Sequence, residues 1–165
     1  MAANVLSLVE RQVTSTAWKR HRLFFRRAVE TTDVHLDFAI DSKPLRDWIQ
    51  EWEGADKAPG EVSLLTPDRP DLAVEQIDRL LGGTPHQYWD RAWLLFCAYC
   101  WDEGCGGVTA DITRRDGMVY WSNLGWNFSY EQDTNLIPKA AVFAFDEREY
   151  DRVLLEARER FRRTA

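Results

Sequence analysis

At 165 residues the chain has the length of one ordinary domain, and its 45% hydrophobic content is enough for a core without disulfide or metal support. No apolar run approaches the roughly 18 residues that cross a bilayer, and the charged pair Glu10–Arg11 comes too early for a secretory leader. These features exclude a transmembrane helix and predict a cytoplasmic protein whose cysteines are reduced.

The net charge of −6 conceals opposed segments, because residues 1–30 carry an excess of four basic side chains and residues 31–90 an excess of eight acidic ones. An acidic surface disfavours phosphate, so we expect no nucleic-acid partner. It favours a basic protein partner, whose approach it would steer. A solvated acidic face without a partner is the simpler alternative.

The first 30 residues permit two interpretations. Val5, Leu8, Val9 and Val13 fit one face of a helix, whereas residues 12–18 are rich in β-prone types. A basic segment follows at residues 18–28, with Lys19, Arg20, Arg22, Arg26 and Arg27 around Leu23, Phe24 and Phe25. It could bind an anion or an acidic partner, but we favour a half-buried segment whose basic side chains pair with the acidic middle of the chain.

Residues 33–41 alternate between polar and apolar types, which predicts a half-buried strand. His35 and Asp37 lie on the polar side of this strand, two residues apart. Such a pair could orient an imidazole for proton transfer or metal binding, or face a partner. The simpler alternative is the solvated side of an amphipathic strand.

Two helices are predicted next. The first has apolar residues at helical spacing between Pro44 and Gly54, namely Leu45, Trp48, Ile49 and Trp52. The second lies within residues 67–83, with Asp68 near its start and Gly82 just past its end. Its inner face is formed by Ala73, Ile77, Leu80 and Leu81. Between the two helices, residues 61–65 are the candidate for a short strand.

The second half reads mainly as strands. Residues 92–100 form one apolar run, residues 107–113 and 118–123 flank a hairpin turn at Asp116–Gly117, and residues 141–145 are a short candidate strand. The chain closes on an amphipathic helix, which Asp146 and Glu149 begin as a capping box. Together these elements predict a single α+β domain over residues 1–165, with a mainly antiparallel sheet and about three helices.

All three cysteines lie within nine positions, as Cys97-x2-Cys100-x4-Cys105. Two thiolates two residues apart are half of a familiar zinc site, and Asp102, Glu103 or His86 could supply a fourth ligand. If residues 93–100 stay extended, however, Cys97 and Cys100 point to opposite faces and cannot share an ion. The open alternatives are therefore a zinc site, a thiol redox pair and buried cysteines in a core strand.

The segment from Leu95 to Tyr130 resembles small uncharacterised actinobacterial proteins. These have Cys-Pro-x-Cys-Gly-Asp-x-Gly-Cys-Gly, then a Val-Thr strand, a charged hairpin and a Trp-rich strand. The resemblance implies a turn that brings the cysteines together, and some such proteins are labelled oxidoreductases. Ala98 and Trp101 stand here where that pattern has Pro and Gly, so two residues that favour the turn are missing.

The chain is rich in tryptophan, with eight residues, and Trp121, Trp126 and Tyr130 lie close to polar groups in a way typical of binding surfaces. The same rings could equally be packed core. No nucleophile, phosphate-loop or dinucleotide motif is present, so an enzyme is not favoured. Our leading hypothesis is a non-catalytic protein-binding module of immunity or antitoxin type, without a cofactor. The alternatives are a zinc-stabilised domain at Cys97, Cys100 and Cys105, and a thiol-dependent oxidoreductase.

Overall fold

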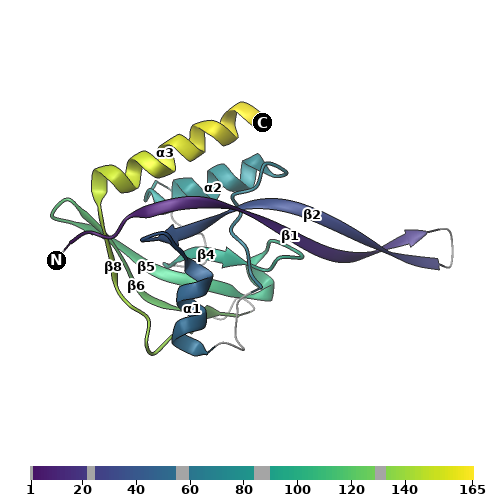
Figure 1. Ribbon diagram of the computed structural model, residues 1–165, viewed down its shortest axis with the longest axis horizontal. Coiled ribbons are helices and arrows are strands. Elements are labelled where there is room, and N and C mark those ends of the chain that lie inside the picture. The colour runs from purple at the N-terminus through teal and green to yellow at the C-terminus, as the bar shows by residue number, and fades with distance from the viewer. Residues whose placement is uncertain (1, 22–24, 55–59, 84–89, 129–132) are drawn as a thin grey trace.

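The computed structural model describes residues 2–21, 25–54, 60–83, 90–128 and 133–165, which form an α+β fold of two antiparallel sheets and three α-helices (Figure 1). The first sheet contains β1 (Leu6–His21), β2 (Phe25–Ile40) and β3 (Lys43–Pro44). The second has the order β4 (Ala92–Phe96), β5 (Gly107–Arg115), β6 (Met118–Asn127) and β7 (Asn135–Leu136), and β8 (Phe143–Asp146) also pairs with β6. The helices are α1 (Leu45–Glu53), α2 (Pro70–Leu80) and α3 (Glu147–Thr164).

The helices and turns that have local signals lie where the sequence predicts them. Helix α1 starts directly after Pro44 and stops at Gly54, and α2 ends just before Gly82, which adopts a positive φ. The β5–β6 hairpin turns at Asp116–Gly117. Asp146 caps α3 by accepting hydrogen bonds from the backbone N–H groups of Arg148 and Glu149.

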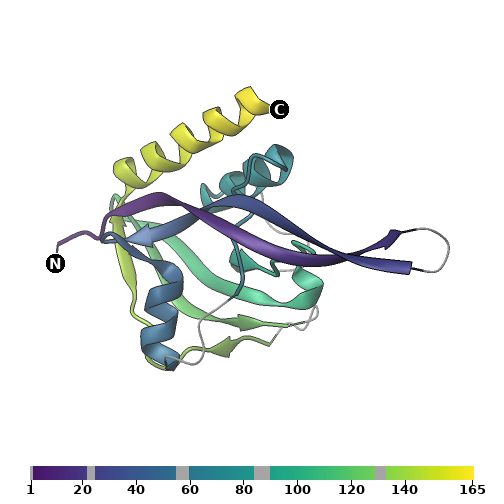
Figure 2. The same cartoon turned by 45° about the vertical axis from the view of Figure 1, so that its right-hand side comes forward.

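The N-terminal segment is extended, so the helical interpretation of residues 5–13 is wrong. β1 and β2 pair in continuous register from Leu6↔Ile40 to His21↔Phe25. One end of this hairpin covers the core, while the other end projects well beyond the rest of the molecule as a two-stranded arm (Figures 1 and 2).

The interpretation of residues 18–28 as half-buried is also wrong where it can be checked. Phe25, Arg26 and Arg27 are exposed, and neither arginine pairs with an acidic group in the described chain.

Two other strand predictions need correction. Residues 61–65 form no strand of their own and make only an isolated bridge between Val62 and Phe96. The apolar run 92–100 is extended only as far as Phe96 and then turns. Both differences matter for the cysteines, because the bridge and the turn lie directly beside them.

The core connects the second sheet to the helices. Trp121 of β6 is buried and donates from Nε1 to the hydroxyl of Tyr150 on α3 over 3.1 Å, and this hydroxyl in turn donates to the carbonyl of Leu80 at the end of α2 over 3.2 Å. Helices α2 and α3 lie side by side above the sheets, joined also by the ion pair Arg158–Asp78 (Figure 1). No helix of the described ranges is both long and apolar enough to cross a membrane.

Candidate metal centre

The cysteine cluster begins where β4 ends. Phe96 exchanges two backbone hydrogen bonds with Val62, of 2.7 and 2.8 Å, and the chain then reverses through residues 97–101. The N–H of Trp101 closes this turn on the carbonyl of Cys97 over 2.9 Å. A turn of this kind brings Cys97 and Cys100 to the same side, so the extended conformation that would separate them does not occur.

Trp101 makes the turn without the glycine that the resembled pattern has there. Its φ is +55°, in the left-handed region that bulky side chains rarely adopt. The indole compensates for this cost, because its Nε1 donates to the carbonyl of Ala98 over 3.2 Å and its ring packs against the apolar cluster of Leu64, Trp93 and Phe96. The missing glycine therefore does not prevent the cysteines from meeting.

The third cysteine comes from a short 3₁₀ turn, Glu103–Cys105. Asp102 caps it by accepting from the N–H of Gly104 over 2.5 Å. Gly106, at φ +85°, then leads into β5, and a Cβ at this position would lie 2.8 Å from the carbonyl oxygen of Asn127. A glycine is thus required to lead from Cys105 into the sheet.

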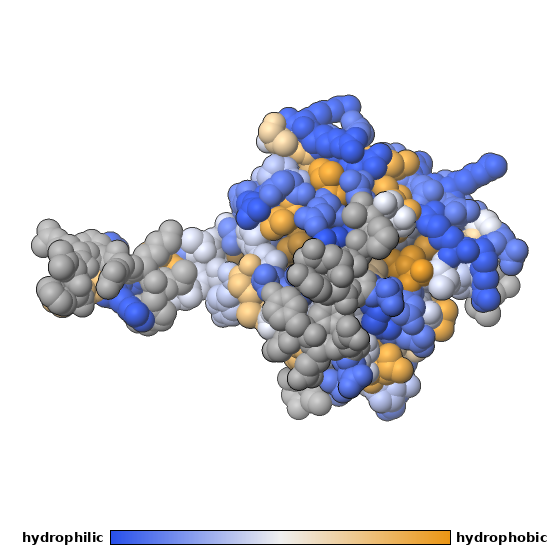
Figure 3. Space-filling model, turned by 180° about the vertical axis from the view of Figure 1, so that it is seen from behind, coloured by the Kyte–Doolittle hydropathy of each residue, from blue (hydrophilic) through white to orange (hydrophobic). Residues whose placement is uncertain are grey.

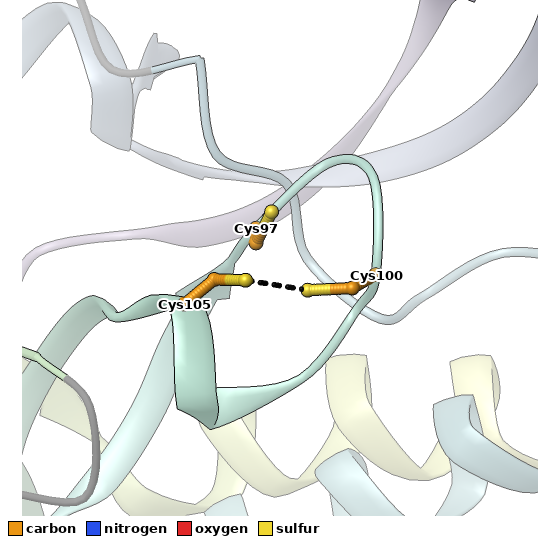
Figure 4. A group of neighbouring side chains, drawn as sticks. All are labelled: Cys97, Cys100 and Cys105. Carbon is orange, nitrogen blue, oxygen red and sulfur yellow. Dashed lines mark hydrogen bonds between the residues drawn. The ribbon is translucent and has the colours of Figure 1, made fainter. Parts of the chain in front are cut away.

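The three sulfur atoms converge from these two turns (Figure 4). All three lie within 4.8 Å of one another, and the sulfurs of Cys100 and Cys105 are 3.0 Å apart. Cys97 is half-buried, whereas Cys100 and Cys105 are exposed. The expectation of buried cysteines in a core strand is therefore wrong, since the cluster lies in a surface turn.

The surroundings of the three sulfurs favour one thiolate among the three cysteines over two or three thiolates. Burial raises the pKa of Cys97, but the N–H groups of Tyr99 and Cys100 and the neighbouring thiols outweigh it, leaving this pKa below its usual value. Burial and the two neighbouring sulfurs raise the pKa of Cys100 to about 12. One thiolate thus forms readily and opposes the ionisation of the next, and a bound cation would remove this opposition.

The geometry is compatible with one tetrahedral ion. Zinc–sulfur bonds of about 2.3 Å place two thiolates about 3.8 Å apart. The separations of 3.0 Å for one pair and at most 4.8 Å for any pair bracket this value, so small side-chain rotations would suffice. Three cysteines leave one coordination position for another group.

Two of the three candidates for the fourth ligand are otherwise engaged. Asp102 caps the 3₁₀ turn, and Glu103 faces Arg79 at 3.7 Å. His86 lies outside the residues that the structure describes. Neither Asp102 nor Glu103 belongs to the group of close metal-ligand atoms found among the described residues, which consists of Cys97, Cys100 and Cys105.

A pocket of about 370 Å³ adjoins the cluster and was not foreseen from the sequence. Its lining includes Cys97 and Cys105 of the cluster together with Arg11 of β1 and Glu61. Arg11 donates to the backbone carbonyl of Glu61 over 3.5 Å, and burial lowers the pKa of its guanidinium. Neither residue carries a sequence signal, because only the fold brings residues 11 and 61 to the cysteines.

The predicted pair His35 and Asp37 is buried, so these residues do not form a solvated polar face. His35 donates from Nδ1 to the carbonyl of Ser63 over 2.7 Å, and burial lowers its pKa. Arg46 donates from Nε and Nη2 to one carboxylate oxygen of Asp37, over 3.0 and 2.7 Å. In the structure both side chains connect β2 to the segments that cover it.

The three aromatic candidates do not form one surface. Trp121 is buried in the core, whereas Trp126 is half-buried, donates to Glu53 over 2.9 Å and stacks on the exposed ring of Phe128. Tyr130 lies outside the described residues.

Comparisons of the chain with protein-family models, with curated proteins and with solved structures find no match, so the site must be interpreted from its own geometry.

Proposed function

We propose that this protein binds one zinc ion through Cys97, Cys100 and Cys105. The observation that carries the proposal is the convergence of three sulfurs from two separate turns to within 4.8 Å. Three thiols have no apolar reason to gather in an exposed turn, because two of them remain in contact with solvent. A shared cation supplies that reason, and zinc is the usual choice for thiolates in a reducing compartment.

The ion would act on the fold itself. The ends of β4 and β5 are already paired at Phe96 and Gly107, but the loop 97–106 between them contains no large buried apolar side chain except the half-buried Trp101. A metal bound by Cys97, Cys100 and Cys105 would hold this loop in one conformation. In this role the protein is a zinc-stabilised domain, and the ion contributes directly to folding.

The test is metal analysis of the untagged protein, purified without chelator, together with a count of reactive thiols. We expect one zinc per chain, thiols that react slowly until a chelator is added, and loss of zinc from C97S, C100S and C105S. The matched control is Y99F, because Tyr99 is exposed in the same turn and offers no ligand to the cluster. Absence of zinc would refute the proposal, and loss of two thiols on mild oxidation without metal would indicate a redox pair.

A second candidate function is partner binding, as in the immunity-type hypothesis. His35, Asp37 and Trp121 are buried and do not support partner binding, whereas two other aromatic rings do. Phe25 on the arm is 72% exposed, and Phe128 beside Trp126 is 43% exposed. Exposed aromatic rings beside charged groups are typical of protein interfaces. Titration of the protein against a basic model protein at rising salt tests the acidic-surface version, which requires binding that weakens steeply with salt.

A further inference from the structure

The pocket beside the cysteine cluster contains a carboxylate oxygen that lacks a partner. Oε2 of Glu61 is buried and accepts no hydrogen bond within the described chain. A buried carboxylate oxygen without a donor or cation is costly, and native proteins rarely leave one in that state. Glu61 lines the same pocket as Cys97 and Cys105, so this residue and two of the three cysteines border one space.

The backbone register explains this proximity. Val62 and Phe96 form an antiparallel bridge, and in an antiparallel pair the residue before one partner faces the residue after the other. Glu61 precedes Val62 and Cys97 follows Phe96, so the two residues flank the bridge at the point where β4 ends. The bridge is thus a structural reason for a carboxylate to stand beside the first cysteine.

The charges of the pocket are consistent with a fourth ligand of this kind. Three thiolates and one carboxylate around a divalent ion leave the same net charge as four thiolates, which is a common zinc environment. Arg11 adds a positive charge in the pocket wall and is held against the backbone of Glu61. Asp102 and Glu103, the acidic residues nearer in sequence, have other partners.

We infer that Glu61 supplies the fourth ligand, so that the centre is Cys97–Cys100–Cys105–Glu61. The inference rests on the proposed zinc binding at the three cysteines. Without metal, Glu61 lines the same pocket as Cys97 and Cys105 but lies outside the group of ligand atoms within 4.8 Å of one another, so its carboxylate must rotate toward the sulfurs to take the open coordination position. The ion then provides the positive partner that Oε2 lacks.

The experiment uses Co²⁺ as a spectroscopic probe, with the full-length chain kept reduced and free of oxygen. Wild-type protein is expected to give the absorption of tetrahedral Co²⁺ with thiolate ligands, and Zn²⁺ is then titrated in competition with a chelator. E61Q keeps the shape of the side chain and removes the charge, so we expect Zn²⁺ affinity to fall by about tenfold or more. E61C replaces the carboxylate by a fourth thiolate, and its Co²⁺–thiolate absorption should rise by about one third over that of wild type. E10Q, at an exposed position next to Arg11, is the matched control and should behave as wild type.

The outcomes separate the two proposals. If wild-type protein binds neither Co²⁺ nor Zn²⁺, zinc binding at the cysteines is wrong. If wild type binds both ions and E61Q matches it in affinity and spectrum, the cysteine site stands and Glu61 is not its ligand. A folding defect is recognised from thermal unfolding in excess chelator, where E61Q should be about as stable as wild type because it keeps the size of the side chain and Oε2 of Glu61 has no hydrogen-bond partner to lose. A fall in metal affinity without a fall in this metal-free stability supports the inference.

Discussion

Replacement of Gln76 by leucine should show how strongly α2 holds the scaffold of the metal centre. This side chain is buried on α2 and makes three hydrogen bonds to two other segments. Its Oε1 accepts from the N–H of Leu64 over 2.7 Å, and its Nε2 donates to the carbonyls of Trp93 and Leu94 over 3.0 and 3.1 Å. These carbonyls lie at the irregularity between Trp93 and Leu95, where the β4–β5 register shifts.

The size of the effect follows from those three bonds. Q76L keeps the volume but leaves one buried N–H and two carbonyls without this partner, and at about 1 kcal/mol for each we expect a loss of about 3 kcal/mol. For a chain of this length the midpoint of thermal unfolding should fall by roughly 6–12 °C. Urea unfolding followed by far-UV circular dichroism measures the free energy, and an unchanged m-value shows that the two-state description holds.

The control is E75Q, at the residue next to Gln76. It removes the ion pair between Glu75 and Arg79 and should lower the free energy of unfolding by at most about 0.5 kcal/mol. If Q76L unfolds within about 0.5 kcal/mol of wild type, the hydrogen bonds of Gln76 do not hold the segments together and the reasoning is refuted. Because Leu64 follows Glu61 by three residues and Leu94 precedes Cys97 by three, Q76L should also weaken zinc binding if the centre includes both residues.

Three further predictions concern stability. Burial lowers the pKa of His35, so the unfolded chain binds a proton at this residue more readily than the folded chain does. The free energy of unfolding should therefore decline as the pH falls below about 6.5, and should not depend on this residue above that pH. Urea titrations from pH 7 to pH 5 should show a smaller decline for H35N than for wild type. D146A should cost about 1 kcal/mol by removing the α3 cap, and D146S should recover most of it; equal stability of all three proteins would contradict the capping role. A Cβ at residue 107 would lie 2.1 Å from the carbonyl oxygen of Leu95, so G107A should cost about 3 kcal/mol or more, while G60A, with open space around it, should stay within about 0.5 kcal/mol.

Elements with local signals could be predicted from the sequence, whereas elements decided by distant partners could not. Helix α3 carries its cap at Asp146 and its apolar stripe within its own residues, and the β5–β6 turn is contained in Asp116–Gly117. The valine and leucine spacing of residues 5–13 suits a helix equally well. Residues 6–13 become a strand because they pair with residues 33–40 of β2, and no short window of the sequence contains both partners.

The candidate site shows the same division. The three cysteines could be identified as a group, but their approach depends on Trp101 in a conformation for which the sequence would lead one to expect glycine. Its burial against Leu64 and Phe96 supplies the stabilisation, and Leu64 comes from a remote part of the chain. From the sequence His35 is expected to be solvated, because the segment that buries it and accepts its hydrogen bond, at Ser63, lies 28 residues away.

The projecting arm has a consequence for how the protein behaves at high concentration. Beyond the core both edges of the β1–β2 ribbon lack a further strand in the described chain, and such edges can pair with those of another molecule (Figure 1). Seen from behind the molecule, the arm extends away from the body in the space-filling view (Figure 3). Residues 17–30 hold five basic residues and one acidic residue, so two arms that approach edge to edge bring like charges together. Salt shortens the reach of such repulsion to about 8 Å at physiological ionic strength, so we expect the arms of separate molecules to associate more readily as the salt concentration rises.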